Sequence, residues 1–531
     1  MVAIFQKIVG TSRNWKTVSV VLFVVILALG IFARVWEFGA VPRGLNQDEA
    51  SIGVEAFSLY RFGVDRNGVS FPVNFISWGN GMDALDGYIL IPFVAAFGLT
   101  PIVVRLPSLL SGILTILLVY FAAKRIFDDE KTALLCMFLL AISPWHILMS
   151  RWGINENVLP FVFVVGFTFI LTAKTNNMNY LIGCASLAIS LYAYGAAYVA
   201  APIFLVCATV ILLTSKRASA KTIIPGVLLF ALLITPIVLF VLTNTLKWES
   251  LQLGFMTIPR LPVRPRYEAV AAVFNERSIR PIVDNVIGMF KLLIRQTDGQ
   301  IFNVVEPYGY LYTITFPLAV IGMVLLFPSR KSPRAPERWM LLSWLAASFA
   351  VGVIQSATIN RMCLLFIPLF MCVALFIVWI GKHSRIVFIA SILALLVGFA
   401  FFTRAYHGKT YREQSTIRFF PGFLSATNSA RHANNASDPI CMTDKVNMPY
   451  VFVQFSEQAD LRDYLDTIEY VDPQAEFRFV RSMGRYTFGL QNCANHPGTI
   501  YVTRYDEELP VAANDYDMTR FDNFLVFTPH P

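Results

Sequence analysis

Long apolar segments separated by short polar ones repeat along residues 17–402 of the chain. Each segment is near the ~20 residues that a helix needs to cross the hydrocarbon core of a bilayer. They predict about eleven membrane-spanning helices, at residues 17–38, 103–122, 132–145, 158–173, 180–194, 198–214, 222–242, 311–327, 339–353, 363–380 and 386–402. The expected fold class is therefore an all-α polytopic membrane protein.

The segment at residues 83–99 decides the sidedness of every later loop. Its second half is apolar, but it begins with Asp83 and Asp86 and contains Pro92. If it lies in the membrane interface, the basic N-terminus and five basic clusters share one side, as the positive-inside rule requires. These clusters contain Lys124, Arg125, Lys131, Lys174, Lys216, Arg217, Lys221, Arg330, Lys331, Arg334, Arg338, Lys382 and Arg385. We therefore expect an interfacial helix at 83–99 and a cytoplasmic N-terminus.

Three longer polar pieces then fall on the opposite side of the membrane. They are a first loop at about 37–100, a second loop at about 243–310 and the tail. We expect a transmembrane domain over residues 1–403, with interfacial helices in its first loop, and a small extracytoplasmic α+β domain over residues 404–531. Patterns within the tail predict a helix and four strands, at 460–467 and at 439–443, 477–482, 498–504 and 523–528.

Composition supports the membrane assignment and narrows the partners. The 531 residues are 56% hydrophobic and only 15% charged, outside the range of ordinary globular domains. The net charge of +9 comes mostly from the basic clusters between apolar segments, so membrane lipids are expected as partners and nucleic acid is not. Only Cys441 and Cys493 of the seven cysteines lie outside apolar segments. In an extracytoplasmic tail they can form a disulfide, and two free thiols are the alternative.

Asp48 and Glu49 are adjacent carboxylates that follow the first apolar segment. On an ordinary exposed loop such a pair is usually solvated surface charge. Here the pair lies between a spanning helix and an interfacial helix, where partial desolvation raises a carboxyl pKa toward the range of a general base. Carboxylate oxygens also bind divalent cations. Asp48 and Glu49 are therefore candidate catalytic residues, and a divalent metal ion is the one cofactor that they suggest.

A second group of polar residues lies in the hairpin at 143–157, on the same side as Asp48. It contains His146, Arg151 and Glu156. The neighbouring aromatic residues suit an interfacial belt, and Arg151 and Glu156 can simply pair with each other. The concentration of Arg, His, Asn and Glu in one hairpin equally suits a site for a polar headgroup.

Arg361 and Arg105 each lie near the start of an apolar segment on the outer side. An arginine at this depth often only extends to the interface, and this interpretation is favoured for Arg105. The other use of such a guanidinium is to bind a phosphate through its planar donors. Tyr192 and Tyr194 occupy an outer turn, where they either belong to the aromatic belt, which is favoured, or stack on a sugar.

The order and sidedness of these features resemble the GT-C superfamily of membrane glycosyltransferases. The resemblance covers roughly residues 15–400 and is closest to glycosyltransferase family 39, the protein O-mannosyltransferases, and their bacterial relatives, the lipid A aminoarabinose transferases. It rests on Asp48-Glu49, Arg105-Leu106-Pro107-Ser108, Ser143-Pro144-Trp145-His146, Ser150-Arg151 and Asn360-Arg361 with Pro368 downstream.

This resemblance implies an enzyme, a bacterial hexosyltransferase in the cytoplasmic membrane. It would take a sugar from a lipid-linked donor, a polyprenyl phosphate such as undecaprenyl phosphate, and transfer it with inversion to a cell-envelope acceptor on the outer side. By analogy, Asp48 is the catalytic base and Arg361, with Arg151 and Arg105, binds the donor phosphate. Glu156 is the second acidic residue, placed with His146 to contact the acceptor or, with Asp48, to hold a metal.

Two other functions remain open at this point. A secondary transporter usually has inverted repeats and polar groups at the bilayer midplane, whereas the acidic residues here lie mostly at or beyond one membrane face. A non-catalytic lipid-binding subunit of the same fold is the other alternative, and the intact Asp48-Glu49 pair argues against it.

Overall fold

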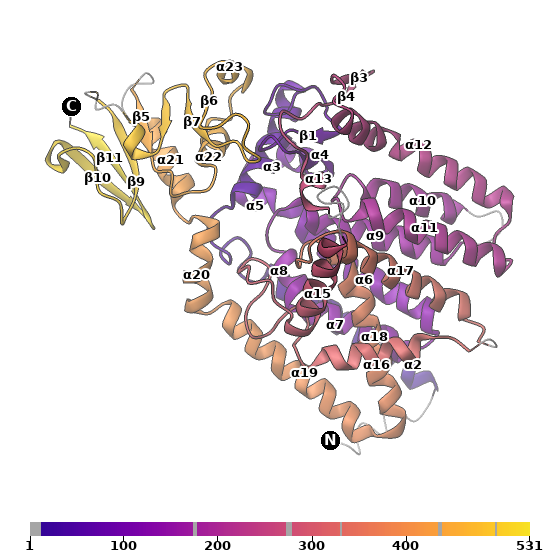
Figure 1. The fold of residues 1–531 in the computed structure, drawn as a ribbon. Helices are drawn as coiled ribbons and strands as arrows, with labels where there is room; N and C mark the ends of the chain where they lie inside the picture. Colours follow the sequence, from indigo (N-terminus) through magenta and orange to yellow (C-terminus); the bar gives the residue numbers. More distant parts are fainter. Residues whose placement is uncertain are drawn as a thin grey trace.

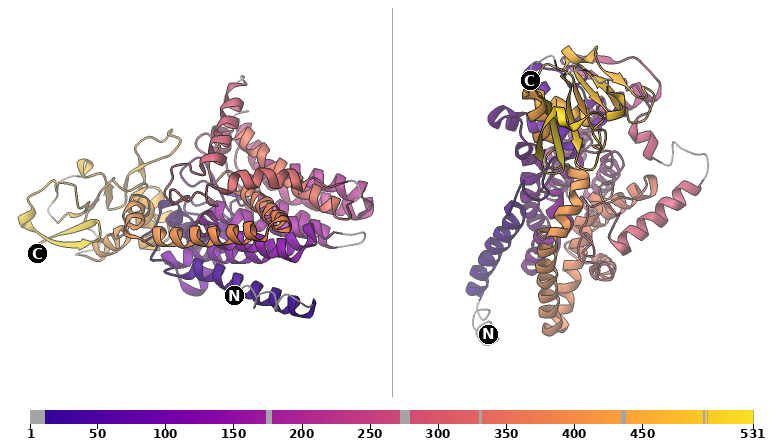
Figure 2. Two further views of the ribbon diagram at one scale, coloured as in Figure 1. Left: turned by 90° about the horizontal axis from the view of Figure 1, so that it is seen from below. Right: turned by 90° about the vertical axis from the view of Figure 1, so that its left-hand side faces the viewer.

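A computed structural model describes residues 12–173, 178–271, 279–329, 332–433, 438–493, 496 and 498–530. It contains a bundle of helices with a smaller, sheet-containing domain at one end (Figure 1). The start of the described chain at Ser12 and the C-terminal sheet lie at opposite ends of the molecule (Figure 2, right). Of the basic residues used to predict sidedness, Lys174, Arg330 and Lys331 lie outside the described residues.

Each predicted apolar segment forms a helix of the bundle. Seven helices in the described part are long and apolar enough to cross a membrane: α2 (Ser12–Val35), α6 (Leu106–Phe127), α11 (Ala197–Thr214), α12 (Ala220–Thr245), α17 (Ala335–Ile354), α18 (Cys363–His383) and α19 (Arg385–Tyr406). Four have 12 to 17 residues: α7 (Glu130–Ile142), α9 (Asn155–Leu171), α10 (Met178–Ser190) and α16 (Thr315–Leu326). These four are shorter than the ~30 Å hydrocarbon core at ~1.5 Å per residue. The multi-pass helical fold is confirmed, with seven helices of spanning length where about eleven were predicted.

Glu337 joins three of the loops that the charge pattern assigned to one side. Its buried carboxylate lies 2.7 Å from Arg217, 3.3 Å from Arg334 and 3.4 Å from Arg125. These arginines follow α11, precede α17 and lie in the last turn of α6. The three loops therefore share one end of the bundle.

The first loop folds into two helices at the other end. Helix α3 (Gln47–Phe62) begins with a capping box, in which the Asn46 side chain accepts from the N–H of Asp48 and the Asn46 N–H donates to Glu49. Helix α4 (Leu85–Phe97) packs against α3 and has 13 residues, too few to span a bilayer. The segment predicted as a helix at 83–99 is therefore a helix, α4, and its location in the interface stays a prediction.

Shorter elements lie in these loops and in the other connections between the helices. They are α5 (Pro101–Val104), α8 (Pro144–Met149), α13 (Arg266–Val270), the amphipathic α15 (Arg280–Arg295) and the two-stranded pairs β1 (Asn74–Phe75) with β2 (Met82–Asp83) and β3 (Leu251–Leu253) with β4 (Met256–Ile258).

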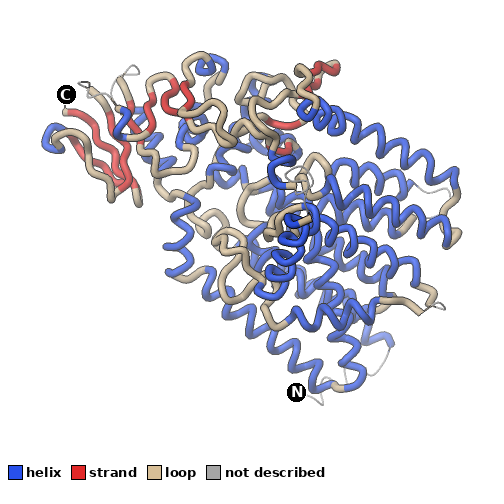
Figure 3. Tube along the Cα trace, viewed as in Figure 1, coloured by secondary structure: helices blue, strands red, loops and turns tan. Residues whose placement is uncertain are grey.

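Helices α20 (Lys409–Phe419) and α21 (Phe423–His432) lead from α19 into the C-terminal sheet (Figures 1 and 3). Its seven strands follow the order β10-β11-β9-β5-β8-β7-β6. Central β5 is parallel to β8 and β9, and the other pairs are antiparallel. The strands are β5 (Ile440–Met442), β6 (Glu469–Tyr470), β7 (Val480–Met483), β8 (Tyr486–Phe488), β9 (Ile500–Arg504), β10 (Tyr516–Phe521) and β11 (Phe524–Pro529).

The predicted α+β character of the tail is confirmed in this sheet. The four predicted strands correspond to β5, β7, β9 and β11, and the predicted helix at 460–467 is reduced to the single turn α23 (Arg462–Leu465). Cys441 and Cys493 are joined by a disulfide. The longer helix α22 (Pro449–Glu457), absent from the prediction, packs against α3 of the first loop. The tail is therefore in direct contact with the segment that carries Asp48.

Candidate active site

A cavity of about 270 Å³ lies at the end of the bundle next to the C-terminal domain. Its wall combines the start of α3, the β1–β2 loop, the start of α9, the α10–α11 turn, α13 and the segment before α18. The charged residues of the wall are three acids and three arginines: Asp48, Asp83, Glu156, Arg266, Arg361 and Arg418.

Asp48 lies in the first turn of α3 with its half-buried carboxylate on the cavity wall. The indole Nε1–H of Trp78 donates to Oδ1 over 3.3 Å, and Gln47 Nε2 donates to Oδ2 over 3.3 Å. Burial raises the pKa of Asp48, and the nearby Arg266 guanidinium and the Trp78 hydrogen bond oppose that rise. The Asp48 carboxylate thus lies at the N-terminus of α3 and faces the cavity.

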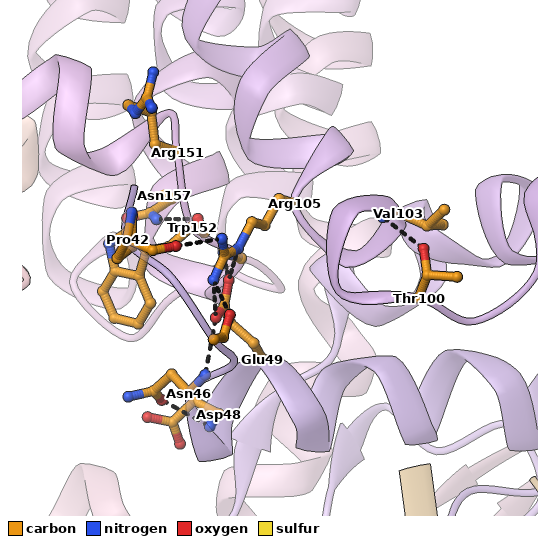
Figure 4. A network of polar contacts seen from close by, with 12 residues as sticks. Pro42, Asn46, Asp48, Glu49, Thr100, Val103, Arg105, Arg151, Trp152 and Asn157 are labelled. Carbon is orange, nitrogen blue, oxygen red and sulfur yellow. Dashed lines mark hydrogen bonds and ion pairs between the residues drawn. The ribbon is translucent and has the colours of Figure 1, made fainter. Parts of the chain in front are cut away.

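Glu49 points away from the cavity and is fully buried (Figure 4). Its Oε1 accepts from Arg105 Nε at 2.7 Å and from the Gly153 N–H at 2.9 Å, while Oε2 accepts from Arg105 Nη2 and the Asn46 N–H, each at 2.9 Å. Four donors therefore occupy this carboxylate. The expectation placed both acids in one site, and the structure brings only Asp48 to the cavity because Glu49 neutralises a buried arginine.

Arg105 was a candidate phosphate ligand and is instead fully buried beside Glu49. Its remaining donors bind the carbonyl oxygens of Pro42 at 2.9 Å and Gly44 at 2.8 Å. The pair holds the chain between α2 and α3 against the start of α6. Four of its five N–H donors are thus used inside the fold, and Arg105 does not line the cavity.

Arg151 and His146 also lie away from the cavity. The buried Arg151 guanidinium satisfies groups around the end of α2: the carbonyls of Arg34, Glu37 and Val41, each at 2.9 Å, and the Tyr406 hydroxyl at 3.1 Å. Buried His146 has Nδ1 at 2.7 Å from Nη2 of Arg34. Arg151 supplies donors that the carbonyls at the end of α2 need once they are buried, and His146 joins α8 to α2 through the Arg34 side chain.

Glu156 and Arg361 reach the cavity from two segments that meet there. The Glu156 Oε1 accepts from Asn360 Nδ2 at 2.7 Å. Arg361 is partly exposed, and its Nη1 donates to the Ser356 carbonyl at 3.1 Å and also contacts the Ser356 hydroxyl. Asp298 fixes this segment by accepting from the Ile359 N–H at 3.0 Å. The sequence prediction that these two residues share a site with Asp48 agrees with their positions on the wall.

Arg266 and Arg418 also line the cavity and were not among the predicted site residues. Arg266 begins α13, and its N–H donates to the Asn80 carbonyl at 2.8 Å. Nearby Tyr194, Glu156 and Asp48 raise its pKa against the effect of burial. The alternation of Pro and Arg at residues 259–266 was a sequence signal for this segment. Nothing comparable marks Arg418.

The two predicted sugar-stacking tyrosines differ in whether they line the cavity. Tyr194 lines the cavity, whereas Tyr192 donates its hydroxyl to the Leu233 carbonyl at 2.6 Å and is not part of the wall. Tyr198 lines the cavity and donates to Asp83 Oδ1 at 2.9 Å. Burial raises the pKa of Asp83 to about 6. Of the two predicted stacking residues, only Tyr194 is available to a ligand in this cavity.

A metal site needs several acidic, sulfur or nitrogen side chains close together. Among the described residues, no group of three or more His, Cys, Asp and Glu gathers closely enough to hold a metal ion. Asp48 and Glu156 line one cavity but lack a third such ligand. The protein side chains described here do not form a preformed metal centre by themselves.

A second, larger cavity of about 810 Å³ adjoins the first and shares Gln300 and Arg418 with it. Its walls are the end of α19, helix α20 and the loop at residues 299–308. Phe401 and Ile417 expose apolar surface there, and Arg404 and Arg418 add positive charge. The polar cavity therefore adjoins a second cavity, with apolar and basic walls, at the end of a helix long enough to span a membrane.

Comparison with known proteins finds one family and several solved structures that are similar to this chain. The family described as dolichyl-phosphate-mannose-protein mannosyltransferase matches residues 85–240. No curated protein matches the sequence. ArnT from Cupriavidus metallidurans bound to undecaprenyl phosphate superposes with a TM-score of 0.56 at 15% identity, covering 98% of each chain, and its apo state gives 0.53 at 14%, covering 97% of this chain and 98% of that chain.

The archaeal oligosaccharyltransferase AglB from Archaeoglobus fulgidus, in complex with an inhibitory peptide and a dolichol-phosphate, is also similar. It superposes with a TM-score of 0.52 at 13% identity, covering 84% of this chain and 64% of that chain. At these identities the likeness concerns the fold. The predicted resemblance to the GT-C superfamily, related to ArnT and the protein mannosyltransferases, is confirmed at that level.

Proposed function

We propose that the protein is a membrane glycosyltransferase that moves a sugar from a polyprenyl-phosphate carrier to an acceptor hydroxyl. One observation carries the proposal: Asp48 shares a cavity with Arg266, Arg361 and Arg418, whose guanidiniums have no ion-pair partner among the described residues. Unpaired guanidiniums in a cavity favour a phosphate ligand. The undecaprenyl phosphate bound in the similar ArnT structure supports this choice.

Asp48 acts as the general base of the proposed reaction. It takes the proton from the acceptor hydroxyl while that oxygen attacks the anomeric carbon of the sugar. The bond from the anomeric carbon to the phosphate oxygen breaks on the opposite face, so the configuration inverts and polyprenyl phosphate leaves. Partial burial suits this role, because it raises the pKa of Asp48 and makes the ionised carboxylate a better proton acceptor.

Arg361 and Arg266 bind the donor phosphate and stabilise the charge that grows on it as the sugar leaves. Arg361 is held by Ser356, and the backbone of Arg266 is held by Asn80. Glu156, bound to Asn360, orients hydroxyl groups of the transferred sugar, and Tyr194 is the wall residue suited to stack on its ring. Glu49, Arg105, Arg151 and His146 support the fold around the site.

The remaining proposals concern the sidedness of the protein, its substrates and a metal ion. We propose that the N-terminus is cytoplasmic, that residues 1–403 form the membrane enzyme and that residues 404–531 form an extracytoplasmic domain of a bacterial protein. The Cys441–Cys493 disulfide supports an oxidising compartment for the tail. The donor sugar is a hexose and the acceptor is an envelope glycan, lipid or protein. A divalent metal remains compatible with Asp48 and Glu156, and no step above depends on it.

The test is sugar transfer by the purified protein in liposomes. Radiolabelled polyprenyl-phosphate hexoses are supplied with an envelope extract, and label leaving the carrier is followed. The wild type is expected to release label, and folded Asp48→Asn to be slower by about 10²-fold or more. Asp463→Asn, an exposed acid on α23 outside the cavity, is the matched control. Absence of release from every donor by the wild type would contradict the proposal.

A further inference from the structure

Trp78 connects Asp48 to the C-terminal domain. Its side chain is only 5% exposed, and its indole N–H is the donor to Asp48 Oδ1 at 3.3 Å. The Trp78 carbonyl accepts from the N–H of Arg478 at 3.0 Å, and its ring meets the ring of Tyr450 edge-on, with 6.1 Å between centroids. Tyr450 belongs to α22 and Arg478 precedes β7. Two segments of the C-terminal domain therefore hold the residue that hydrogen-bonds Asp48.

Arg66 covers the face of the same indole. Its guanidinium carbon lies 4.4 Å from the Trp78 ring centroid and 5.7 Å from that of Tyr450. Arg66 is 2% exposed and its Nε lies 3.0 Å from Glu55 Oε1. Its two Nη atoms have no hydrogen-bond partner among the described residues. The rings of Trp78 and Tyr450 therefore provide the contacts of this end of the guanidinium. A desolvated cation over an indole holds the ring more firmly than an exposed one.

Gly79 allows the chain to pass directly beneath Arg478. Its φ is +109°, and a Cβ at this position would lie 2.7 Å from Arg478 Nε. Any other residue would therefore be strained by its backbone and would also displace the arginine. The β1–β2 loop therefore meets the C-terminal domain through a backbone hydrogen bond at Trp78 and a close approach at Gly79.

We propose that Trp78 is a positioning residue for Asp48 and that the C-terminal domain, through Tyr450 and Arg478, holds Trp78 in place. The inference rests on the proposed function, because it takes Asp48 as the base. A donor on Oδ1 fixes the plane of the carboxylate and aims it into the cavity. The C-terminal domain then contributes to the chemical step whether or not it also binds the acceptor.

Other charges near Asp48 set the background for a test by pH. The groups that face it are Arg266 of α13, Arg66 after α3, its neighbour Glu49, and Glu156 of α9. The indole N–H stabilises the ionised carboxylate, so its removal raises the pKa of Asp48 while leaving these four groups in place. The acid limb of the pH profile is expected to move to higher pH.

The experiment compares kcat/KM against pH for sugar transfer by full-length protein in liposomes. Trp78→Phe keeps an aromatic ring and removes the donor, and it is expected to lower kcat about tenfold and shift the acid limb upward by about one pH unit. The KM for the carrier is expected to change less than about twofold, because no phosphate contact is lost. Trp344→Phe removes a buried indole in α17 and controls for packing loss alone.

Tyr450→Leu tests the contribution of the C-terminal domain without altering Trp78. Tyr501→Leu is its control, since Tyr501 is also buried in the C-terminal domain but lies on β9 and packs near the disulfide. Only Tyr450→Leu is expected to shift the acid limb. A wild-type profile in folded Trp78→Phe overturns the positioning role, and equal profiles for Tyr450→Leu and Tyr501→Leu overturn the role of the domain. Activity retained by Asp48→Asn would instead overturn the proposed base.

Discussion

The substitution Glu49→Gln separates the two adjacent carboxylates by role. Glu49 accepts four hydrogen bonds, two on each oxygen. A glutamine turns one of these oxygens into a donor, so two buried donors lose their acceptor in either orientation of the amide. At ~1–3 kcal/mol for each unsatisfied buried group, the loss is about 2–6 kcal/mol, in line with the ~3–5 kcal/mol for breaking a buried ion pair.

The assay is unfolding of the purified protein in detergent, together with sugar transfer per folded molecule. Glu49→Gln is expected to unfold at a clearly lower temperature than the wild type but to keep activity in its folded fraction at low temperature. The double variant Glu49→Gln with Arg105→Met is expected to recover part of the loss, because the uncompensated buried charge is gone. A variant with wild-type stability and no activity would refute the structural role of Glu49.

Three further predictions concern Asp48, Arg361 and the tail. Asp48→Asn is expected to unfold at the same or a higher temperature than the wild type at pH 8. Burial raises the pKa of Asp48, so its ionised form is unfavourable in the folded state above that pKa. Calorimetry showing a lower unfolding temperature would contradict this. Arg361→Ala should weaken binding of polyprenyl phosphate about 10-fold or more, and Arg361→Lys should weaken it less, as measured by competition with labelled carrier; equal affinity in all three proteins would exclude a phosphate contact. Reducing the Cys441–Cys493 bond, which spans 52 residues, should destabilise the tail by about 4 kcal/mol, and an unchanged denaturant midpoint would argue against it.

Helix order and the shared end of three basic loops were readable from the sequence because they depend on local properties. Apolar length marks a membrane helix, and the basic clusters mark one end, where Glu337 gathers three of them. The number of full crossings was not readable in the same way. Helices α10 and α16 are shorter than their apolar segments at 180–194 and 311–327, because apolar residues continue into the adjoining turns.

Part of the candidate site was likewise predictable from the sequence, and part depended on the fold. Asp48, Glu156 and Arg361 were expected near one another, and all three line the cavity. Glu49 and Arg105 are 56 positions apart, and only the fold reveals that each neutralises the other. A charge at the membrane boundary looks the same in sequence whether it binds a ligand or a buried partner.

The residues that sequence reasoning missed depend on contacts across still longer distances. Arg418 follows the membrane domain by several helical turns, yet its carbonyl accepts from Asn46 at 2.7 Å and thereby joins the wall beside Asp48. Trp78 becomes relevant only when Tyr450 and Arg478 close over it. No local sequence pattern predicts these long-range contacts.

The most direct test of the account measures carrier binding and single-turnover sugar transfer in the same preparations of Asp48→Asn and Arg361→Ala. The proposed mechanism assigns proton transfer to Asp48 and phosphate binding to Arg361. We therefore expect Asp48→Asn to bind polyprenyl phosphate like the wild type but to transfer sugar about 10²-fold or more slowly, and Arg361→Ala to lose affinity. Transfer at the wild-type rate by Asp48→Asn would contradict the account.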